Sequence, residues 1–122
     1  MISTNTLIKV FDNSGAKIAQ CIKVFKKSKK NDARVGDIIV VSVKKALVKK
    51  KINKGQVVLG LIIRTRRTLN RKNGNSIKYN ENAIIIVNKL GIPVGTRIIG
   101  PVSYELRVKK MMKVLSIASS II

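Results

Sequence analysis

Apolar residues along the chain gather into runs of strand length, separated by glycines and polar segments. None of these runs has the three-to-four-residue period of a helix face until the end of the chain. We therefore expect strands at 6–11, 18–25, 36–43, 56–64 and 83–88. Five short strands with turn signals at similar spacing predict a mainly β fold with a small five-stranded β-barrel, because closure removes exposed strand edges.

The pattern within the strands differs along the chain. TLIKVF and AQCIKVF alternate apolar and polar residues, whereas IIVVSV and AIIIV are almost continuously apolar. Continuous runs are typical of a closed barrel or of strands covered on both faces. Branched aliphatic residues must supply most of the core, since 19 residues are Ile and only 3% are aromatic. A chain of 122 residues is expected to form one domain, 1–122.

A projecting basic β-hairpin is predicted at 64–80, between the last two of these strands. Asn73-Gly74 favours a type I′ turn, in which both central residues have positive φ. Arms of about seven residues, at about 3.3 Å per residue, would extend the flanking strands and project roughly 20 Å.

Beyond Pro101 the pattern becomes helical, and we expect one or two short C-terminal α-helices within 103–116. Ser103 is suited to cap a helix, with Glu105 in its first turn and lysines towards its end. One apolar face at spacings of three and four would dock on the barrel, formed by Tyr104, Val108, Met111, Met112 and Leu115.

Charge changes the picture most. The chain has 26 Lys and Arg residues against five Asp and Glu residues, a formal net charge of +21. The net charge of a small domain usually has a magnitude of about 2–8. Repulsion at a higher net charge destabilises the compact state unless a polyanion offsets it. The cations lie mainly in connections, with five at 26–34, six at 44–54, six at 64–80 and four at 107–113. This placement favours nucleic acid as the partner, while an ordinary solvated hairpin is the alternative for 64–80.

Enzymatic chemistry has little support in the sequence. There is no His, one Cys and five scattered carboxylates, and segments such as GDIIVV lack the glycine pattern of a phosphate loop. We therefore expect no catalytic residue, no metal site and no cofactor. Cys21 fits a small buried residue in a reducing compartment. No apolar run is long enough for a transmembrane helix, and the N-terminus lacks the features of a signal or transit peptide.

The few aromatic residues bear on how nucleic acid would be bound. Loop lysines and arginines contact phosphates regardless of sequence. Single-strand platforms stack bases on exposed aromatic rings, but Phe11 and Phe25 fall at core positions and Tyr79 is better placed for packing. The pattern favours structured RNA or a duplex, bound by shape and backbone.

Several stretches together resemble one known family. They are DNSGAK (12–17), VGDIIVVSVKKA (35–46), LIIRTRR, NGNSIKYNENAIII and GTRIIGPVSYELR (95–107). They closely resemble the bacterial-type large-subunit ribosomal protein L-fourteen family, whose five-stranded barrel, projecting β-ribbon and short C-terminal helices agree with the pattern above. The resemblance implies a structural constituent of the large ribosomal subunit that binds large-subunit rRNA and contributes to an inter-subunit bridge.

The resemblance also implies partners and site residues. The partners are large-subunit rRNA, small-subunit rRNA at the bridge, ribosomal proteins L-nineteen and L-three, and a ribosome-silencing factor. The residues expected to bind rRNA are Lys26, Lys27, Lys29, Lys30, Lys44, Lys45, Lys49, Lys50, Lys51, Lys54, Arg64, Arg66, Arg67, Arg71, Lys72 and Lys78. Those expected at the bridge or at a protein contact are Arg97, Arg107, Lys109, Lys110 and Lys113.

The chain departs from the family pattern at a few places. Lys26-Lys27 stand where the family has a Gly-rich pair, Lys49–Lys51 form a denser cluster, and the tail SIASSII lacks the usual Pro and acidic residues. Lys, Ile and Asn make up 48 of 122 residues, and A/T-rich codons encode all three. That composition favours an organelle-encoded chain of the mitochondrial matrix, with a plastid or a bacterial cytoplasm as alternatives. The alternative function is a free-standing RNA-binding translation factor with a small β-barrel.

Overall fold

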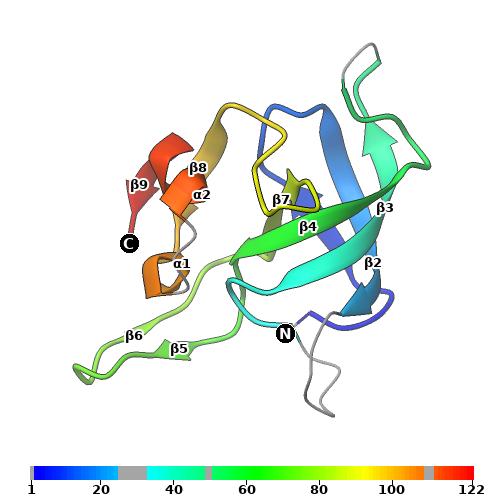
Figure 1. Cartoon of the computed structure of the whole chain (residues 1–122). Helices are drawn as coiled ribbons and strands as arrows, with labels where there is room; N and C mark the ends of the chain where they lie inside the picture. Colours follow the sequence, from blue (N-terminus) through cyan, green and yellow to red (C-terminus); the bar gives the residue numbers. More distant parts are fainter. Residues whose placement is uncertain (1, 25–32, 49–50, 109–111) are drawn as a thin grey trace.

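The computed structural model describes residues 2–24, 33–48, 51–108 and 112–122 and has the predicted mainly β architecture (Figure 1). The five barrel strands begin and end within three residues of the predicted bounds. They are β1 (Leu7–Val10), β2 (Ala16–Val24), β3 (Ile38–Ala46), β4 (Val57–Arg64) and β7 (Ala83–Val87). The barrel is closed in the order β1-β2-β3-β4-β7, which confirms the predicted fold class.

The barrel closes through a parallel pair between its first and last strands. Lys9 lies opposite Ala83, and Val10 lies opposite Ile84, while the other four neighbouring pairs run antiparallel. All five residues of β7 are buried, as the continuous apolar run AIIIV predicts for a strand covered on both faces. The core therefore consists mainly of Ile, Val and Leu from the barrel strands.

Two residues predicted to be buried can be compared with the structure. Cys21 is fully buried within β2, which confirms its interpretation as a core residue. Burial raises the pKa of its thiol, with a smaller opposing effect from a backbone hydrogen bond at Lys23. Phe11 is half-buried against the core, whereas Phe25 lies outside the described residues.

The hairpin is present, but its predicted continuous arms are wrong. Strand β4 ends at Arg64, and a separate two-stranded sheet begins at β5 (Leu69–Asn70), which pairs with β6 (Ser76–Ile77). The two-residue strands leave the basic ribbon detached from the barrel sheet, as the extension at the lower left of Figure 1 shows. The segment between β4 and β5 instead lines a pocket, described below.

The tip of the hairpin also differs from the predicted type I′ turn. Gly74 has φ 85°, but Asn73 is not among the residues with positive φ. The Gly74 N–H donates to the Arg71 carbonyl (3.1 Å), and the Arg71 N–H donates to the Asn75 carbonyl (2.8 Å). These bonds enclose a three-residue loop in which one glycine takes the left-handed conformation. The Asn73 side chain accepts the Asn75 N–H (3.0 Å) and so stabilises this longer loop.

The C-terminal segment contains a strand pair that the sequence did not predict. Strand β8 (Ile98–Val102) pairs in parallel with β9 (Ala118–Ile121), and the helices α1 (Glu105–Val108) and α2 (Met112–Ile117) lie between them in the chain. The two helices confirm the expectation of one or two short ones. The Ile99 N–H donates to the Phe11 carbonyl (2.9 Å), which attaches β8 to the barrel.

The predicted apolar helix face is only partly correct. Leu115 is buried, but Tyr104 and Met112 are 45% and 58% exposed. Met111 and the side chain of Val108 lie outside the described residues. Leu106 and Val114 pack into the core instead. A single helical period cannot run through two separate helices of four and six residues. Tertiary packing therefore determines which side chains of these helices are buried.

Candidate nucleic-acid interface

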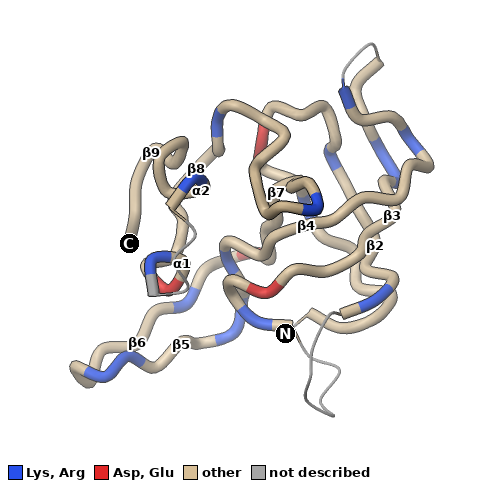
Figure 2. Tube along the Cα trace, in the orientation of Figure 1, with Lys and Arg blue, Asp and Glu red and all other residues tan. Residues whose placement is uncertain are grey.

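The end of β3 and the connection from β3 to β4 carry one group of predicted rRNA ligands (Figure 2). The side chains of Lys44, Lys45, Lys51 and Lys54 are all exposed. Ile52, between Lys51 and Lys54, is only 5% exposed, and its N–H donates a hydrogen bond to the Ser14 carbonyl (3.3 Å). This buried anchor lets the connection present its lysines to solvent while it stays attached to the barrel.

The hairpin carries a second group of exposed cations. Arg66 and Arg67 lie at its base, Lys72 lies in the turn, and Lys78 lies beyond β6. The Arg66 N–H donates to the Asn82 side-chain carbonyl (2.9 Å), which fixes the start of the hairpin against its end. The ribbon thus displays four of its six predicted rRNA ligands to solvent.

Arg64, which was predicted to bind rRNA, is buried within the protein. Its side chain is only 5% exposed, and the guanidinium lies 4.5 Å from the centre of the Phe11 ring. Its Nη1 donates to the carbonyls of Pro101 (3.1 Å) and Ile99 (3.4 Å). The cation therefore fastens β8 to the end of β4 through contacts within the protein.

Two further observations support this structural role. Gly100 has φ 83°, and a side chain there would collide with the Arg64 guanidinium, so the two residues are packed as a pair. Burial lowers the pKa of Arg64, while the charges of Glu81 and Tyr79 oppose that shift.

Arg71 also has protein partners that the sequence did not predict. Its Nε donates to Glu105 Oε1 (3.0 Å), its Nη2 donates to the main-chain oxygen of Ile122 (2.6 Å), and its guanidinium lies 5.9 Å from the Tyr104 ring centre. Burial acts to raise the pKa of Glu105, but hydrogen bonds from Arg71 and Ser103 outweigh it and hold that pKa below its ordinary value. Arg71 thus ties the hairpin to the C-terminal segment.

Among the cations predicted at the bridge, the three that the structure describes lie in separate parts of the C-terminal region. Arg97 precedes β8, Arg107 belongs to α1 and Lys113 belongs to α2, and all three are exposed. The loop before Arg97 is braced by Asn13, whose side-chain carbonyl accepts the N–H groups of Thr96 (2.7 Å) and Arg97 (3.2 Å). The DNSG stretch does not by itself indicate this role for Asn13.

The remaining predicted site residues lie outside the part of the chain that the structure describes. They are Lys26, Lys27, Lys29, Lys30, Lys49, Lys50, Lys109 and Lys110.

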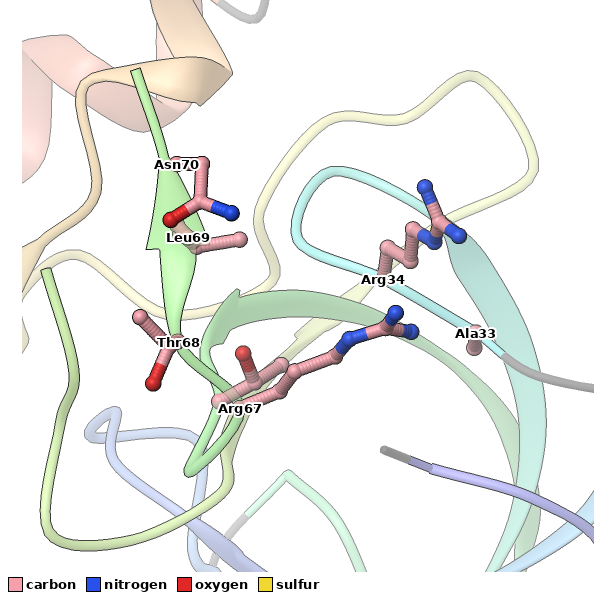
Figure 3. A pocket seen from close by; sticks show the side chains of 7 residues that line it. Ala33, Arg34, Arg67, Thr68, Leu69 and Asn70 are labelled. Carbon is pink, nitrogen blue, oxygen red and sulfur yellow. The ribbon is translucent and has the colours of Figure 1, made fainter. Parts of the chain in front are cut away.

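A basic pocket lies beside the start of the hairpin (Figure 3). Its volume is about 250 Å³, and it brings Arg67 together with Arg34, which was not among the predicted rRNA ligands. The composition of 26–34 showed that Arg34 belongs to a basic segment. Only the fold places it opposite the hairpin.

Other chemistry has no visible site in the described residues. They contain no group of three or more His, Cys, Asp and Glu side chains arranged to hold a metal ion. Within the same residues, no helix is both long enough and apolar enough to cross a membrane.

A comparison with protein families extends over the whole chain. The family described as ribosomal protein L14p/L23e matches residues 1–122, including every barrel strand and the basic ribbon. This match confirms the resemblance that the sequence motifs indicated. The chain therefore belongs to the ribosomal protein L14p/L23e family and is a structural protein of the large ribosomal subunit.

Proposed function

We propose that the protein binds large-subunit rRNA through the exposed cations of its loops and hairpin. The main support for this proposal is that the exposed cations lie on loops and on the hairpin, whereas the barrel core is apolar. Eight predicted ligands have exposed side chains on the β3–β4 side and on the hairpin: Lys44, Lys45, Lys51, Lys54, Arg66, Arg67, Lys72 and Lys78. Loop cations of this kind neutralise backbone phosphates and release counterions.

The acidic residues cannot neutralise this charge within the protein. Only five stand against 26 cations. Asp12 is buried and accepts hydrogen bonds from the Ser14 hydroxyl (2.6 Å) and the Ile86 N–H (2.9 Å). Glu105 is taken by Arg71. An external polyanion is therefore needed to offset the repulsion among the loops.

We further propose that the C-terminal region contributes to an inter-subunit bridge. Arg97, Arg107 and Lys113 are exposed there, and the family resemblance assigns this region, with Lys109 and Lys110, to contacts with small-subunit rRNA and a ribosome-silencing factor. Ribosomal proteins L-nineteen and L-three are the proposed protein neighbours. The composition rich in Lys, Ile and Asn favours a mitochondrial ribosome as the site of action.

Salt dependence tests the rRNA proposal. The combined change of Arg66, Arg67, Lys72 and Lys78 to Gln should reduce the slope of log K against log salt for rRNA binding by roughly three, since about four phosphate contacts are lost. Lys17→Gln, at an exposed position of β2, is the single-site control. An unchanged slope in the fourfold variant would contradict the assignment of the hairpin to rRNA.

Sedimentation separates the structural role from a free-standing RNA-binding factor. A structural constituent should remain with the large subunit through a high-salt wash, and a factor should elute. The bridge is tested separately by subunit joining with Arg107→Ala and Lys113→Ala. Joining no weaker than with Lys17→Ala would count against the bridge.

A further inference from the structure

Another pocket lies between the hairpin and the start of the C-terminal helical segment (Figure 1). Its volume is about 440 Å³, and two parts of the chain that are far apart in the sequence form its walls. The hairpin contributes residues 70–73, and the other wall is the first residue of α1 with the residue before it. The lining residues are Asn70, Arg71, Lys72, Asn73, Tyr104 and Glu105.

Tyr104 is the aromatic residue in this lining. It was predicted to pack on the barrel, but it is 45% exposed. Its neighbours Ser103 and Leu106 are fully buried, and the Tyr104 N–H donates to the Ile122 carbonyl (2.9 Å). The backbone that carries the ring is therefore fixed by the fold, which lowers the entropy cost of binding a ligand there.

Arg71 lies beside this ring, and its guanidinium is 5.9 Å from the ring centre. The guanidinium donates hydrogen bonds to Glu105 and to the main-chain oxygen of Ile122. Guanidinium N–H groups lie in the plane of the group, so such bonds use its edge, and a flat ligand can still stack on its face. The ring and the guanidinium are both flat groups of the kind on which nucleic-acid bases stack.

The polar groups of the lining match the edge of a base better than they match a phosphate. Asn70 and Asn73 supply amides, and the Asn73 side-chain carbonyl accepts the Asn75 N–H (3.0 Å), so its NH2 group is the donor that it presents. The Glu105 carboxylate disfavours an anion inside the pocket, whereas a base is neutral. Lys72, exposed on the same turn, supplies a cation for the phosphate attached to that base.

We propose that this pocket binds one unpaired base of rRNA, stacked against Tyr104 and Arg71, with the amides of Asn70 and Asn73 hydrogen-bonded to its edge. The volume falls within the range of about 300–1,000 Å³ that is usual for small-molecule pockets. The base must be unpaired because a base inside a duplex has no free face for the ring. This inference rests on the proposed rRNA binding and adds a contact that does not depend on phosphate charge.

Removing the ring tests the contact. Tyr104→Leu should weaken binding to full-length large-subunit rRNA by about 5- to 100-fold, because the stacking energy of one base is lost. Tyr104→Phe keeps the ring and should bind within about twofold of wild type. The matched control is Leu90→Ala, an 83% exposed apolar side chain outside the pocket, which should change affinity less than about twofold. Thermal unfolding of each variant shows whether the fold is intact.

Salt dependence separates stacking from the loss of phosphate contacts. Stacking releases no counterions, so Tyr104→Leu should lower log K by the same amount at every salt concentration and leave the slope against log salt unchanged. A reduced slope would mean that the substitution acts by displacing cations of the hairpin, and it would overturn the stacking contact.

Ultraviolet crosslinking supplies a direct readout that a merely structural role would not move. Irradiation of the complex should join an RNA base to the tryptic peptide 98–107, in which Tyr104 is the only aromatic residue. The crosslink should persist in Tyr104→Phe and disappear in Tyr104→Leu.

The outcomes distinguish this inference from the proposed function. Without a crosslink at this peptide, or without a loss of affinity in Tyr104→Leu, the base pocket is wrong, as it would be if a protein side chain filled it. Binding of rRNA still stands in that case if the fourfold hairpin variant reduces the salt slope. If neither Tyr104→Leu nor the fourfold variant alters rRNA binding, the proposed function itself fails.

Discussion

Removing the charge of Glu105 should loosen the C-terminal segment from the hairpin without unfolding the barrel. The substitution Glu105→Gln preserves the shape of the side chain but removes its ion pair with Arg71, whose Nε lies 3.0 Å from Oε1. The same arginine also binds the main-chain oxygen of Ile122. The substitution should therefore destabilise the contacts where β8, β9 and the hairpin meet.

The size of the effect follows from the burial of the pair. The two side chains are 23% and 28% exposed, so the interaction lies between a surface ion pair and a buried one. Exposed pairs contribute about 0.2–1 kcal/mol, and hydrogen bonds to charged groups contribute about 1.5–3 kcal/mol. We therefore expect Glu105→Gln to lower the local free energy of opening by about 1–2 kcal/mol, which is roughly a 5- to 30-fold increase in the opening equilibrium constant.

Amide hydrogen exchange measures this opening at the right place. The Tyr104 N–H donates to the Ile122 carbonyl (2.9 Å), and the Ile122 N–H donates to the Val102 carbonyl (3.0 Å). Exchange at these two amides should become faster by the factor above. The Ile86 N–H, bound to Asp12 inside the barrel, is the internal control and should keep its rate.

The pH dependence has a definite sign. The pKa of Glu105 in the folded protein lies below its ordinary value of 4.5. Its stabilising effect is therefore complete above pH 4.5 and is lost as the pH falls through the lowered pKa. Wild type and Glu105→Gln should differ most near neutral pH and converge in acid.

A double-mutant cycle with Arg71→Met provides the decisive comparison. A coupling energy of about 1–2 kcal/mol between the two sites is expected. A coupling below about 0.3 kcal/mol, or a difference between wild type and Glu105→Gln that persists in acid, would refute the assignment of Arg71 to this contact.

Three further tests probe other parts of the structure. Gly100→Ala should lower the free energy of unfolding in urea by more than Gly55→Ala, because both have positive φ but only the first would collide with a neighbouring side chain; the expected excess is about 1–3 kcal/mol. Arg64→Met should reduce stability by about 2–4 kcal/mol and leave the salt slope of rRNA binding unchanged, whereas Arg66→Gln should reduce that slope by about 0.7–0.9 and leave stability nearly unchanged. Cys21 should resist alkylation by iodoacetamide at neutral pH until urea unfolds the barrel, because burial raises the pKa of its thiol.

The barrel strands could be predicted from the sequence because the order of apolar and polar residues in each strand reflects which of its side chains are buried. AIIIV is apolar throughout because β7 is buried throughout, and TLIKVF alternates because β1 has one exposed side. These patterns are local, so they survive without knowledge of the partner strand. The family motifs added the ribosomal assignment, which the match over residues 1–122 confirmed.

The sequence was less informative where long-range contacts select the structure. Strands β8 and β9 are short, β8 contains Gly100 and Pro101, and their parallel pairing depends on the helices between them. The apolar face expected across 103–116 was replaced by Leu106 and Val114, because the segment breaks into two helices.

The sequence alone determined how many cations the protein has. The tertiary structure determined what each of these cations contacts. The sequence does not distinguish the roles of the six cations of 64–80. In the fold, Arg64 is buried under β8, Arg71 joins the hairpin to Glu105, and Arg67 faces Arg34 across a pocket. A cation's role depends on which oxygen atoms lie within about 3 Å of it, and chain closure over tens of residues decides that distance.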